Sequence, residues 1–284
     1  MYKFSLIDNN HLTSNDEYTL FPFYEESNNG TFSPLKDSPF CGLTLRKSGS
    51  MRFRWNEVND KRDTLLGKIE DKLSINKEDK KSFVPVQLFH TKDVYDVKEK
   101  SETNEKIGDG IVTINSSLIP TITVADCVPI FLYDKNSGAF GIVHSGWKGT
   151  GIAENAIKLM KEKYGTKVDD VYVVIGPHIG EECYIVNEER AKYFIDNFTP
   201  LCVKKVIDGE KVPGNWDSGS GQLYHLSLSE ANVALLKRVG VKDSHISLCT
   251  DCTACNKLYG SNRRETSISG VANEFTVMAA FISK

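Results

Sequence analysis

Short apolar runs separated by turn residues dominate the pattern of hydrophobic and polar positions along the chain. In the middle of the sequence, apolar runs at residues 122–124, 128–133 and 139–143 are bounded by polar residues or glycine. Runs of this length, rich in β-branched and aromatic side chains, are typical of β-strands. The polar residues 135–138 between the second and third runs predict a hairpin that makes those two strands neighbours.

Similar runs predict further strands on both sides of this region. They lie at residues 3–7, 18–24, 42–47, 82–89, 111–114, 169–175, 183–186, 201–207, 245–249 and 275–282. Pro85 has no N–H to donate to a strand ladder. The strand at residues 82–89 is therefore expected at the edge of a sheet, or to end near this proline.

Helical patterns appear in four stretches, at residues 59–72, 151–164, 187–197 and 227–238. In the second, Ile152 and Met160 fall on one face and Gly165 closes the helix. In the fourth, Ser227 and Glu230 have the spacing of a capping box. Strands and helices follow one another without strict alternation, and no repeat or low-complexity linker interrupts them. We therefore predict an α+β fold for the chain.

Composition and charge exclude several classes of protein. The 284 residues are 40% hydrophobic and 26% charged, as is ordinary for a soluble globular protein. The net charge of −3 and an isoelectric point of about 6.1 give no general attraction to nucleic acid or to anionic membranes. No apolar run is long enough to span a bilayer, and the N-terminal sequence lacks the pattern of a secretion signal. The seven cysteines are then expected to be reduced thiols or metal ligands in a cytoplasmic protein.

Two chemically active side chains lie beside the central strands. Cys127 stands between the first two strands and His144 ends the third, so a thiol and an imidazole can meet on neighbouring strands. Each also has a plain structural interpretation, Cys127 as a small buried hydrophobe and His144 as a hydrogen-bonded residue at a strand end. Asp126 beside the cysteine, and the run His-Ser-Gly-Trp-Lys-Gly that begins at the histidine, favour a functional pair. A strand end, a glycine-rich turn and a helix start together suit chemistry on an anion.

His90, at the end of the strand predicted for residues 82–89, offers a second imidazole. With Cys127 and His144 it supplies two nitrogens and one thiolate, a donor set that suits zinc in tetrahedral coordination. The fourth position is then left for water or substrate, and zinc lowers the pKa of a bound water to about 7. The gaps of 37 and 17 residues match no compact metal motif. The alternative is a metal-free pair in which Cys127 is the nucleophile and His144 the base.

Cys249, Cys252 and Cys255 form two overlapping Cys-x-x-Cys units, a pattern that often holds zinc or an iron–sulfur cluster. No cysteine follows them, and His245 lies on a predicted strand that keeps it from joining them. We therefore predict that the Cys249/Cys252/Cys255 cluster holds no structural metal and consists of reduced thiols near a turn. The protein should then contain close to one zinc ion per chain.

Basic and polar residues elsewhere are candidates for binding an anion. Arg263 and Arg264 place two guanidinium groups together, either as solvated charge or for bidentate recognition of phosphate or carboxylate. Lys148, at a predicted helix start, is placed to assist with the same anion. His178 and Cys183 flank a Gly-Pro turn and either line a pocket or simply accompany the turn.

Six short motifs follow one another along the chain. They are residues 87–90 (QLFH), 109–113 (DGIVT), 123–129 (TVADCVP), 144–150 (HSGWKGT), 175–186 (IGPHIGEECYIV), and a late segment that runs from Cys249 to residues 261–264 (SNRR). In this order they resemble the bacterial laccase-domain family, also called the polyphenol oxidase family, over about residues 84–264. The chain differs from the family at Thr91, Lys148 and Asn262, where glycine, arginine and tyrosine are usual, and it matches poorly at residues 51–55.

The resemblance implies a single layered domain over residues 1–284, of α+β class, with mixed β-sheets flanked by helices. Its core would be related to that of a bacterial toxin deamidase with a Cys–His pair. The resemblance also implies a zinc site built from His90, Cys127 and His144. Family members are described as purine nucleoside phosphorylases that also deaminate adenosine and cleave methylthioadenosine. Purine nucleosides and phosphate are therefore the expected partners, and the oligomeric state stays open, a homodimer included.

Roles in substrate binding follow from the implied activity. Phosphate would attack the ribose C1′, and a zinc-activated water would attack C6 of adenine. Arg263 and Lys148 would hold phosphate or ribose oxygens, and His178 would belong to the same binding site. Within the arginine pair, the resemblance assigns the anion to Arg263 and leaves Arg264 as a surface or ion-pair residue.

The implied catalytic residues are Cys127, His144 and Asp126, the last of which would orient a ligand or move a proton. An older assignment makes the family copper-dependent phenol oxidases, with copper as the alternative metal. One set of two histidines and a cysteine cannot supply the several coppers that four-electron reduction of oxygen uses, and methionine is scarce. A Cys–His hydrolase or deamidase is the third alternative. Metal content separates it from the zinc enzyme, because a zinc-bound thiolate is a poor free nucleophile.

Overall fold

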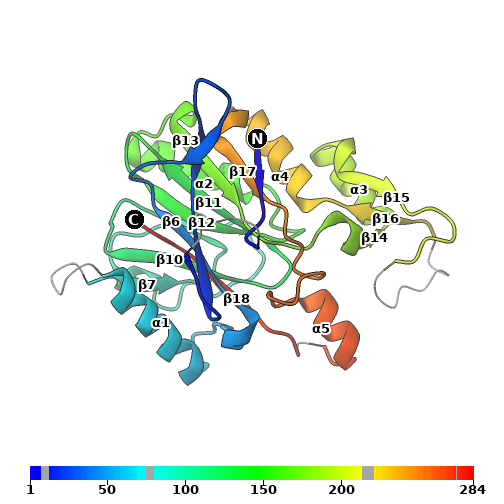
Figure 1. Cartoon of the computed structure of the whole chain (residues 1–284), viewed down its shortest axis with the longest axis horizontal. Helices are drawn as coiled ribbons and strands as arrows, with labels where there is room; N and C mark the ends of the chain where they lie inside the picture. The colour runs from blue at the N-terminus through cyan, green and yellow to red at the C-terminus, as the bar shows by residue number, and fades with distance from the viewer. Residues whose placement is uncertain (8–12, 75–79, 213–220, 273) are drawn as a thin grey trace.

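The computed structural model describes residues 1–7, 13–74, 80–212, 221–272 and 274–284, and Figure 1 shows the whole chain. The helices in these residues are α1 (Asp60–Leu73), α2 (Ile152–Tyr164), α3 (Glu188–Asn197), α4 (Leu228–Arg238) and α5 (Asn262–Ser269). The strands in these residues form four sheets. The fold is thus mixed α/β, with several sheets and five helices in the described residues, as the predicted mixture of elements indicates. None of these helices is long and apolar enough to cross a membrane.

Two large sheets make up the centre of the molecule. In sheet order, the seven-stranded sheet consists of β1 (Tyr2–Phe4), β17 (Ile246–Cys249), β13 (Val171–Ile175), β11 (Val128–Asp134), β12 (Phe140–Ser145), β9 (Gly110–Thr113) and β8 (Val94–Asp96). The six-stranded sheet consists of β2 (Thr13–Ser14), β3 (Tyr18–Pro22), β6 (Phe40–Thr44), β18 (Met278–Ser283), β10 (Leu118–Val124) and β7 (Ser82–Pro85). Both sheets contain parallel and antiparallel pairs.

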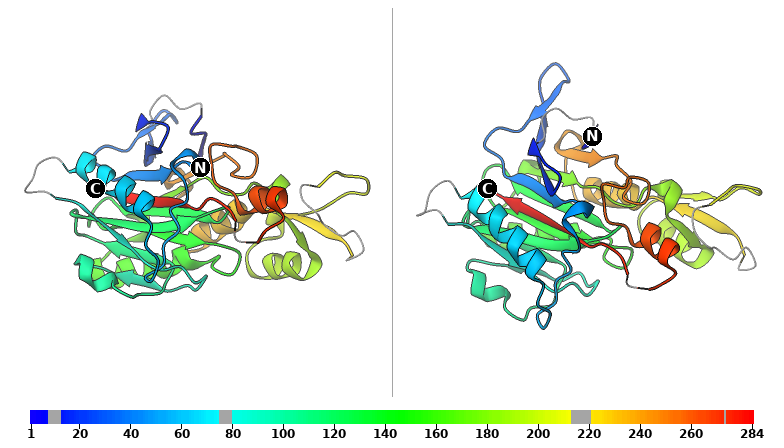
Figure 2. Two further views of the ribbon diagram at one scale, coloured as in Figure 1. Left: turned by 90° about the horizontal axis from the view of Figure 1, so that it is seen from below. Right: turned by 60° about the horizontal axis from the view of Figure 1, so that its bottom comes forward.

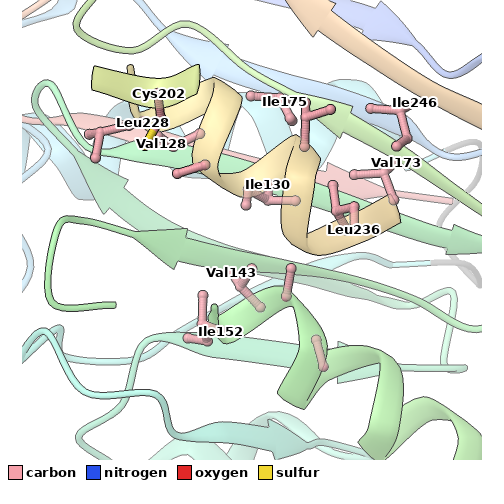
Figure 3. Close-up of a cluster of buried hydrophobic side chains, with 14 of the residues drawn as sticks. Val128, Ile130, Val143, Ile152, Val173, Ile175, Cys202, Leu228, Leu236 and Ile246 are labelled. Carbon is pink, nitrogen blue, oxygen red and sulfur yellow. The ribbon is translucent and has the colours of Figure 1, made fainter. Parts of the chain in front are cut away.

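One face of the seven-stranded sheet is covered by α2 and α4. Figure 3 shows Ile152 of α2 and Leu228 and Leu236 of α4 among sheet residues such as Ile130 and Val173. Every residue of β11 is buried, because the opposite face of the sheet is covered as well. Burial on both faces explains why this strand appears in the sequence as a continuous apolar run and not as an alternating one.

The opposite face of the seven-stranded sheet packs directly against the six-stranded sheet. Along β11, Ile130 lies in the helix-covered core, whereas its neighbour Phe131 lies in the core between the sheets. Ala280 of β18 lies in that same inter-sheet core. On the far face of the six-stranded sheet, α1 contributes Leu65 and Ile69 to a further core (Figure 2). The chain therefore forms four layers in the order helix, sheet, sheet, helix.

A smaller sheet lies beside α3 at one side of the molecule, on the right in Figure 1. Its strands, in sheet order, are β14 (Ile185–Asn187), β16 (Leu223–Leu226) and β15 (Val203–Lys205), while β4 (Tyr24–Glu26) and β5 (Phe32–Pro34) form a separate pair. Local side chains begin the nearby helices. Asn187 accepts the N–H of Arg190 at the start of α3, and Ser227 accepts that of Glu230 at the start of α4. Both are N-caps, and the second confirms the predicted capping residue.

Most predicted elements agree with the structure to within a few residues. The strand predicted at residues 82–89 is shorter, because β7 ends at Pro85, and it lies at a sheet edge as expected. The strand predicted at residues 183–186 is wrong at its start, because Cys183 ends a 3₁₀ turn and β14 begins only at Ile185. Helix α5 was not predicted. Its cap is Ser261, whose hydroxyl accepts the N–H of Arg264.

Candidate metal centre and its cavity

Cys127 lies where the chain passes from one large sheet to the other. It follows β10 of the six-stranded sheet and directly precedes β11 of the seven-stranded sheet. Asp126 just before it has a φ of +79°, a left-handed conformation in which aspartate is enriched. His144 lies in the adjacent strand β12, opposite Pro129 of β11. The thiol and the imidazole therefore come together on neighbouring strands, as the sequence predicts.

His90 joins this pair from the loop after β7. One ligand atom from each of His90, Cys127 and His144 lies within 4.8 Å of the other two. The two imidazole rings are 5.1 Å apart between centroids, and their planes differ by 77°. The φ of His90 is +57°, an uncommon backbone conformation for a histidine. The fold thus brings together the three residues predicted as metal ligands, and we call them the His₂Cys centre.

The space beside the His₂Cys centre fits an ion. A Cβ atom added to Gly146 would lie 3.0 Å from Sγ of Cys127, 3.4 Å from Cδ2 of His90 and 3.6 Å from Cε1 of His144. Glycine at this position therefore keeps open the space that a side chain would fill. Two imidazoles and one thiolate form a donor set that zinc prefers, with a fourth position left for an outside ligand. On donor chemistry, the residues present fit a zinc ion.

Asp109 holds both histidines in place. Its carboxylate is fully buried, and Oδ1 lies 2.8 Å from Nδ1 of His144. The same oxygen accepts the backbone N–H of His90 at 3.1 Å, while Oδ2 accepts the N–H and the hydroxyl of Thr91 at 2.6 and 2.8 Å. A carboxylate behind a ligand histidine orients the ring and raises its basicity. With Nδ1 engaged by Asp109, Nε2 is the nitrogen of His144 that is left to act as a ligand.

Asp109 is missing from the residues predicted for the site. In the sequence it begins the motif at residues 109–113, but Asp-Gly before an apolar run indicates a turn and not a role beside a metal. In the structure its carbonyl accepts the N–H of His144 at 2.7 Å, next to the pairing of β9 with β12. Burial alone would raise the pKa of Asp109, but hydrogen bonds from His144 and Thr91 hold it below its ordinary value. Asp109 is therefore the hydrogen-bond acceptor for Nδ1 of His144.

The side chains of the His₂Cys centre shift one another's pKa values. Burial raises the pKa of the Cys127 thiol, but the charges and hydrogen bonds of His144 and His90 bring it down to about 7. Burial lowers the pKa of His144, but the Cys127 thiolate and the hydrogen bond with Asp109 raise it to about 9. Without a metal ion, the centre thus favours a thiolate beside a protonated imidazole. A thiolate is the form that binds metal and also the form that acts as a nucleophile.

Asp126 ties the Cys127 segment to α5. Its Oδ1 accepts the hydroxyl of Thr253 at 2.6 Å, and its Oδ2 accepts the backbone N–H of Arg263 at 2.6 Å. Burial raises the pKa of Asp126, and these hydrogen bonds oppose the rise. Both carboxylate oxygens are engaged by the protein, which fits a role in orienting neighbouring groups. Its role in moving a proton stays a prediction.

A cavity of about 740 Å³ opens over the centre. Its lining includes the three candidate ligands and Asp126, together with Trp147, Tyr184, Asn262 and Arg263. The guanidinium carbon of Arg263 lies 5.7 Å from the centroid of the Tyr184 ring. Burial lowers the pKa of Arg263, although arginine remains a cation at neutral pH. A cavity of this size, with aromatic walls and a half-buried cation, suits a small aromatic ligand accompanied by an anion.

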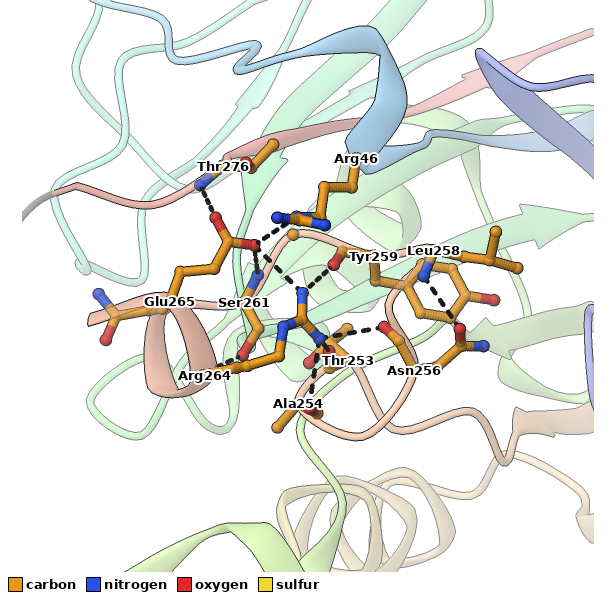
Figure 4. Close-up of polar contacts among 12 residues, drawn as sticks. Arg46, Thr253, Ala254, Asn256, Leu258, Tyr259, Ser261, Arg264, Glu265 and Thr276 are labelled. Carbon is orange, nitrogen blue, oxygen red and sulfur yellow. Dashed lines mark hydrogen bonds and ion pairs between the residues drawn. The ribbon is translucent and has the colours of Figure 1, made fainter. Parts of the chain in front are cut away.

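Arg264 differs in its contacts from Arg263. Its guanidinium donates to four backbone oxygens, those of Thr253, Ala254, Asn256 and Tyr259 (Figure 4). It also forms an ion pair with Glu265 at 3.1 Å. Its side chain is only 13% exposed, so the prediction of a surface residue is wrong, whereas the ion pair is confirmed. Arg264, a residue of α5, thus holds the loop that precedes this helix against it.

Two predicted binding residues are not among the described residues that line the cavity. Lys148 is exposed, and its ammonium nitrogen lies 5.2 Å from the centroid of the Trp147 ring. His178 is buried, its Nδ1 lies 2.8 Å from the carbonyl oxygen of Gly176, and burial lowers its pKa. Contact with a substrate stays a prediction for both residues.

The late cysteines are arranged differently from the prediction. Cys249 ends β17 and is buried, with Sγ 3.6 Å from a carboxylate oxygen of Asp251. Cys252 and Cys255 lie instead with Cys183, and one sulfur atom from each is within 4.8 Å of the other two. Cys249 therefore lies outside this group, and the absence of a structural metal from the Cys249/Cys252/Cys255 cluster stays a prediction. The third partner comes from a segment far earlier in the chain, and nearness in sequence could not indicate it.

Four layers with a His₂Cys centre in the lining of a cavity define a candidate metal-dependent enzyme. A family model described as "multi-copper polyphenol oxidoreductase laccase" matches residues 51–279. Because this match covers most of the sequence, the chain belongs to that family, as the motifs indicated. The solved structure of the hypothetical protein YfiH from Bacillus licheniformis has the same fold, with a TM-score of 0.74 at 23% identity over 97% of this chain and 99% of that one.

Named relatives associate the family with purine nucleosides. "Purine nucleoside phosphorylase YlmD" of Geobacillus stearothermophilus is 34% identical over 165 residues, which are 57% of this chain and 57% of that protein. The solved structure of YlmD has a TM-score of 0.70, covering 93% of this chain and 99% of that one. "Adenosine deaminase RL5", from an unknown prokaryotic organism, is 28% identical over 165 residues, 56% of this chain and 57% of that protein. In sequence, this chain thus matches little more than half the length of these relatives.

Proposed function

We propose that this chain is a zinc-dependent purine nucleoside phosphorylase that uses adenosine, inosine and methylthioadenosine and also deaminates adenosine. The observation that carries the proposal is one cavity whose lining holds both the His₂Cys centre and the Arg263 guanidinium. Phosphorolysis of a nucleoside needs a place for an aromatic base, a place for an anion and a charged group near the reacting bond. The names of the relatives support both activities.

The His₂Cys centre would hold the metal. His90, Cys127 and His144 are the proposed ligands, and a zinc ion bound there would supply Lewis acidity at the cavity lining. Asp109 fixes the ring of His144 and the backbone of His90 through one carboxylate oxygen. The ligand set is therefore held in position before a substrate enters, which reduces the reorganisation needed during the reaction.

Arg263 would bind phosphate and present it to the ribose. A guanidinium group offers paired donors to two phosphate oxygens, and burial strengthens such a charge-assisted contact. The backbone N–H of Arg263 is fixed by Asp126, so the start of α5 is anchored next to the Cys127 segment. A phosphate oxygen would then form a bond to C1′ while the bond from C1′ to the purine nitrogen breaks. The electron pair leaves with the purine, which takes up a proton.

Deamination would use the same position for the base. The rings of Trp147 and Tyr184 in the cavity lining suit stacking against a purine. The oxygen of water would add at C6, and ammonia would leave after its nitrogen gains a proton. Asp126 is the carboxyl group in the cavity lining that we propose orients the ligand or moves that proton.

The test is to incubate zinc-loaded protein with adenosine, with and without phosphate. Ribose 1-phosphate and adenine should form only when phosphate is present, and inosine should form in both cases. Inosine and methylthioadenosine are then offered with phosphate to establish the range of substrates. Zinc-loaded protein that produces none of these products would reject the proposal.

A Cys–His hydrolase or deamidase is a second candidate, because the pKa of Cys127 is lowered to about 7 beside a protonated His144. Such a thiolate can attack a carbonyl or amide carbon when no metal engages it. The two mechanisms exclude each other, since a zinc-bound thiolate is a poor free nucleophile.

The family description also names copper. Oxygen uptake with phenols in copper-loaded protein tests that third activity.

A further inference from the structure

A second group of metal-binding side chains lies on other loops. Cys183, Cys252 and Cys255, which we call the three-cysteine group, place their sulfur atoms within 4.8 Å of one another. Sγ of Cys183 and Sγ of Cys255 are only 3.1 Å apart. Cys183 ends a 3₁₀ turn, whereas the other two belong to the loop after β17. An isolated parallel β-bridge between His178 and Cys252 holds the two segments side by side.

The surroundings of Cys252 suit a thiolate. The backbone N–H of Gly180 donates to Sγ of Cys252 at 3.1 Å. A Cβ atom at Gly180 would lie 3.2 Å from Cβ and 3.3 Å from Sγ of Cys252, so the glycine permits this close approach. A hydrogen bond to sulfur favours its charged form. Three thiolates so close together repel one another unless a cation lies among them.

We propose that the three-cysteine group binds one zinc ion at a site separate from the His₂Cys centre. Three sulfur donors are soft ligands that select zinc over calcium or magnesium. Cys183 is buried, Cys252 is half-buried and Cys255 is exposed, so the group opens to solvent on one side. Water would take the fourth position there. Binding displaces the protons of the three thiols and needs neither an oxidant nor a reductant.

An ion at this site would fix one wall of the catalytic cavity. Thr253, between two of the cysteines, donates its hydroxyl to Asp126, the neighbour of Cys127. On the other segment, Cys183 is followed by Tyr184, whose side chain lines the cavity. An ion that joins the two segments therefore holds the partner of Asp126 and the ring of Tyr184 together. Its loss should loosen the cavity wall while leaving every proposed catalytic ligand in place.

Metal analysis of the full chain, purified with reductant and without oxygen, is the first test. The wild type should hold about two zinc ions per chain, in place of the one that the sequence alone predicted. Cys252→Ser and Cys255→Ser should each lose about one of them. Cys249→Ala is the matched control and should lose none, because it removes a neighbouring thiol outside the group. Cys255 is exposed, so Cys255→Ser should keep the fold, as circular dichroism will verify.

Cobalt substitution makes the test independent of the proposed function. In Cys127→Ser the His₂Cys centre has no sulfur ligand left, so among the described cysteines only the three-cysteine group is arranged to give a strong sulfur-to-cobalt band in the near ultraviolet. The band should appear in Cys127→Ser and largely disappear in Cys127→Ser/Cys252→Ser. Its absence from Cys127→Ser overturns the proposal. A disulfide between Cys183 and Cys255 in protein kept free of oxygen would overturn it too.

Discussion

The two candidate metal groups are built by different parts of the fold. The His₂Cys centre takes Cys127 from the residue before β11 and His144 from the adjoining strand β12, and a buried carboxylate, Asp109, holds the histidines. The three-cysteine group takes its ligands from two loops that meet at one isolated β-bridge, and its hydrogen-bond donor is a backbone N–H. The first group lines the cavity, whereas the three cysteines are not among the described residues that line it, and each group has one exposed member, His90 or Cys255.

This difference indicates what each arrangement is suited for. A donor set of two imidazoles and a thiolate that faces a cavity and is oriented by a buried carboxylate is suited to chemistry on a ligand. An all-sulfur group at the junction of two loops is suited to holding those loops together. Changes in the first group should therefore alter turnover more than stability, and changes in the second should do the reverse.

Removing a ligand of the His₂Cys centre should have the largest effect on turnover. His144→Ala leaves two protein ligands and should lose both zinc from the centre and nucleoside turnover, while the folded core remains. Cys255→Ser is the comparison, since it should lose zinc from the three-cysteine group and keep measurable turnover. Metal analysis and the adenosine assay on both variants check this. Equal loss of turnover in the two variants would mean that the groups do not differ in function.

Asp109→Asn should weaken zinc binding at the His₂Cys centre by about 10–100-fold, because the ring of His144 loses its charged partner. Titration against a competing chelator measures the change. Asp134→Asn is the matched control, since Asp134 is equally buried but caps the hairpin after β11 through Asn136 and Ser137. The control should lower stability without changing zinc affinity. An unchanged affinity in Asp109→Asn would show that the carboxylate does not support the metal.

Substitution of Arg263 should affect phosphate binding, whereas substitution of Arg264 should affect the stability of the fold. Arg264→Ala removes donors from four loop carbonyls and should lower the free energy of unfolding by about 1–3 kcal/mol, with loss of zinc from the three-cysteine group. Arg263→Ala should instead weaken phosphate binding by about 1.5–3 kcal/mol, because that contact is charge-assisted. Thermal unfolding and the phosphate dependence of turnover distinguish the two. Small and equal effects from both changes would leave Arg263 without the proposed role.

Gly146→Ala should have the smallest effect of this series, a several-fold loss of zinc affinity. The added methyl group would lie 3.0 Å from Sγ of Cys127 and would press the ligands apart. Gly67→Ala is the control, because nothing lies within 4 Å of a Cβ atom at that position in α1. There the change should raise stability by about 0.5–1 kcal/mol and leave metal binding unaltered. Tighter zinc binding in Gly146→Ala would contradict the role given to the glycine.

Local sequence patterns were sufficient where burial leaves a clear pattern. The hairpin was predicted because the turn residues 135–138 separate two apolar runs, and helix α2 was predicted because its apolar residues repeat at helical spacing and Gly165 ends it. Helix α5 was missed because none of its residues is buried, so no apolar stripe marks it. Its local signals are the cap Ser261 and the closing Gly270.

Sequence motifs indicated part of the site but not the contacts between distant segments. The grouping of His90, Cys127 and His144 was predicted through chemistry and family resemblance. Asp109 was not found, because its role depends on the pairing of β9 with β12, which sequence spacing does not express. The contact of Cys183 with Cys252 and Cys255 likewise depends on two distant loops packing together. Long-range contacts of this kind are set by the assembled sheets and not by any one segment.

The spacing of the proposed ligands also sets how far folding must advance before each group is complete. His90 and His144 are 54 residues apart in the sequence, and closing such a loop in an unfolded chain has an entropic cost that grows with its length. Cys252 and Cys255 are three residues apart, but Cys183 lies 69 residues before Cys252, so only the pair is close together before any sheet exists. Either group, once complete, would therefore mark a chain whose distant segments have already come together.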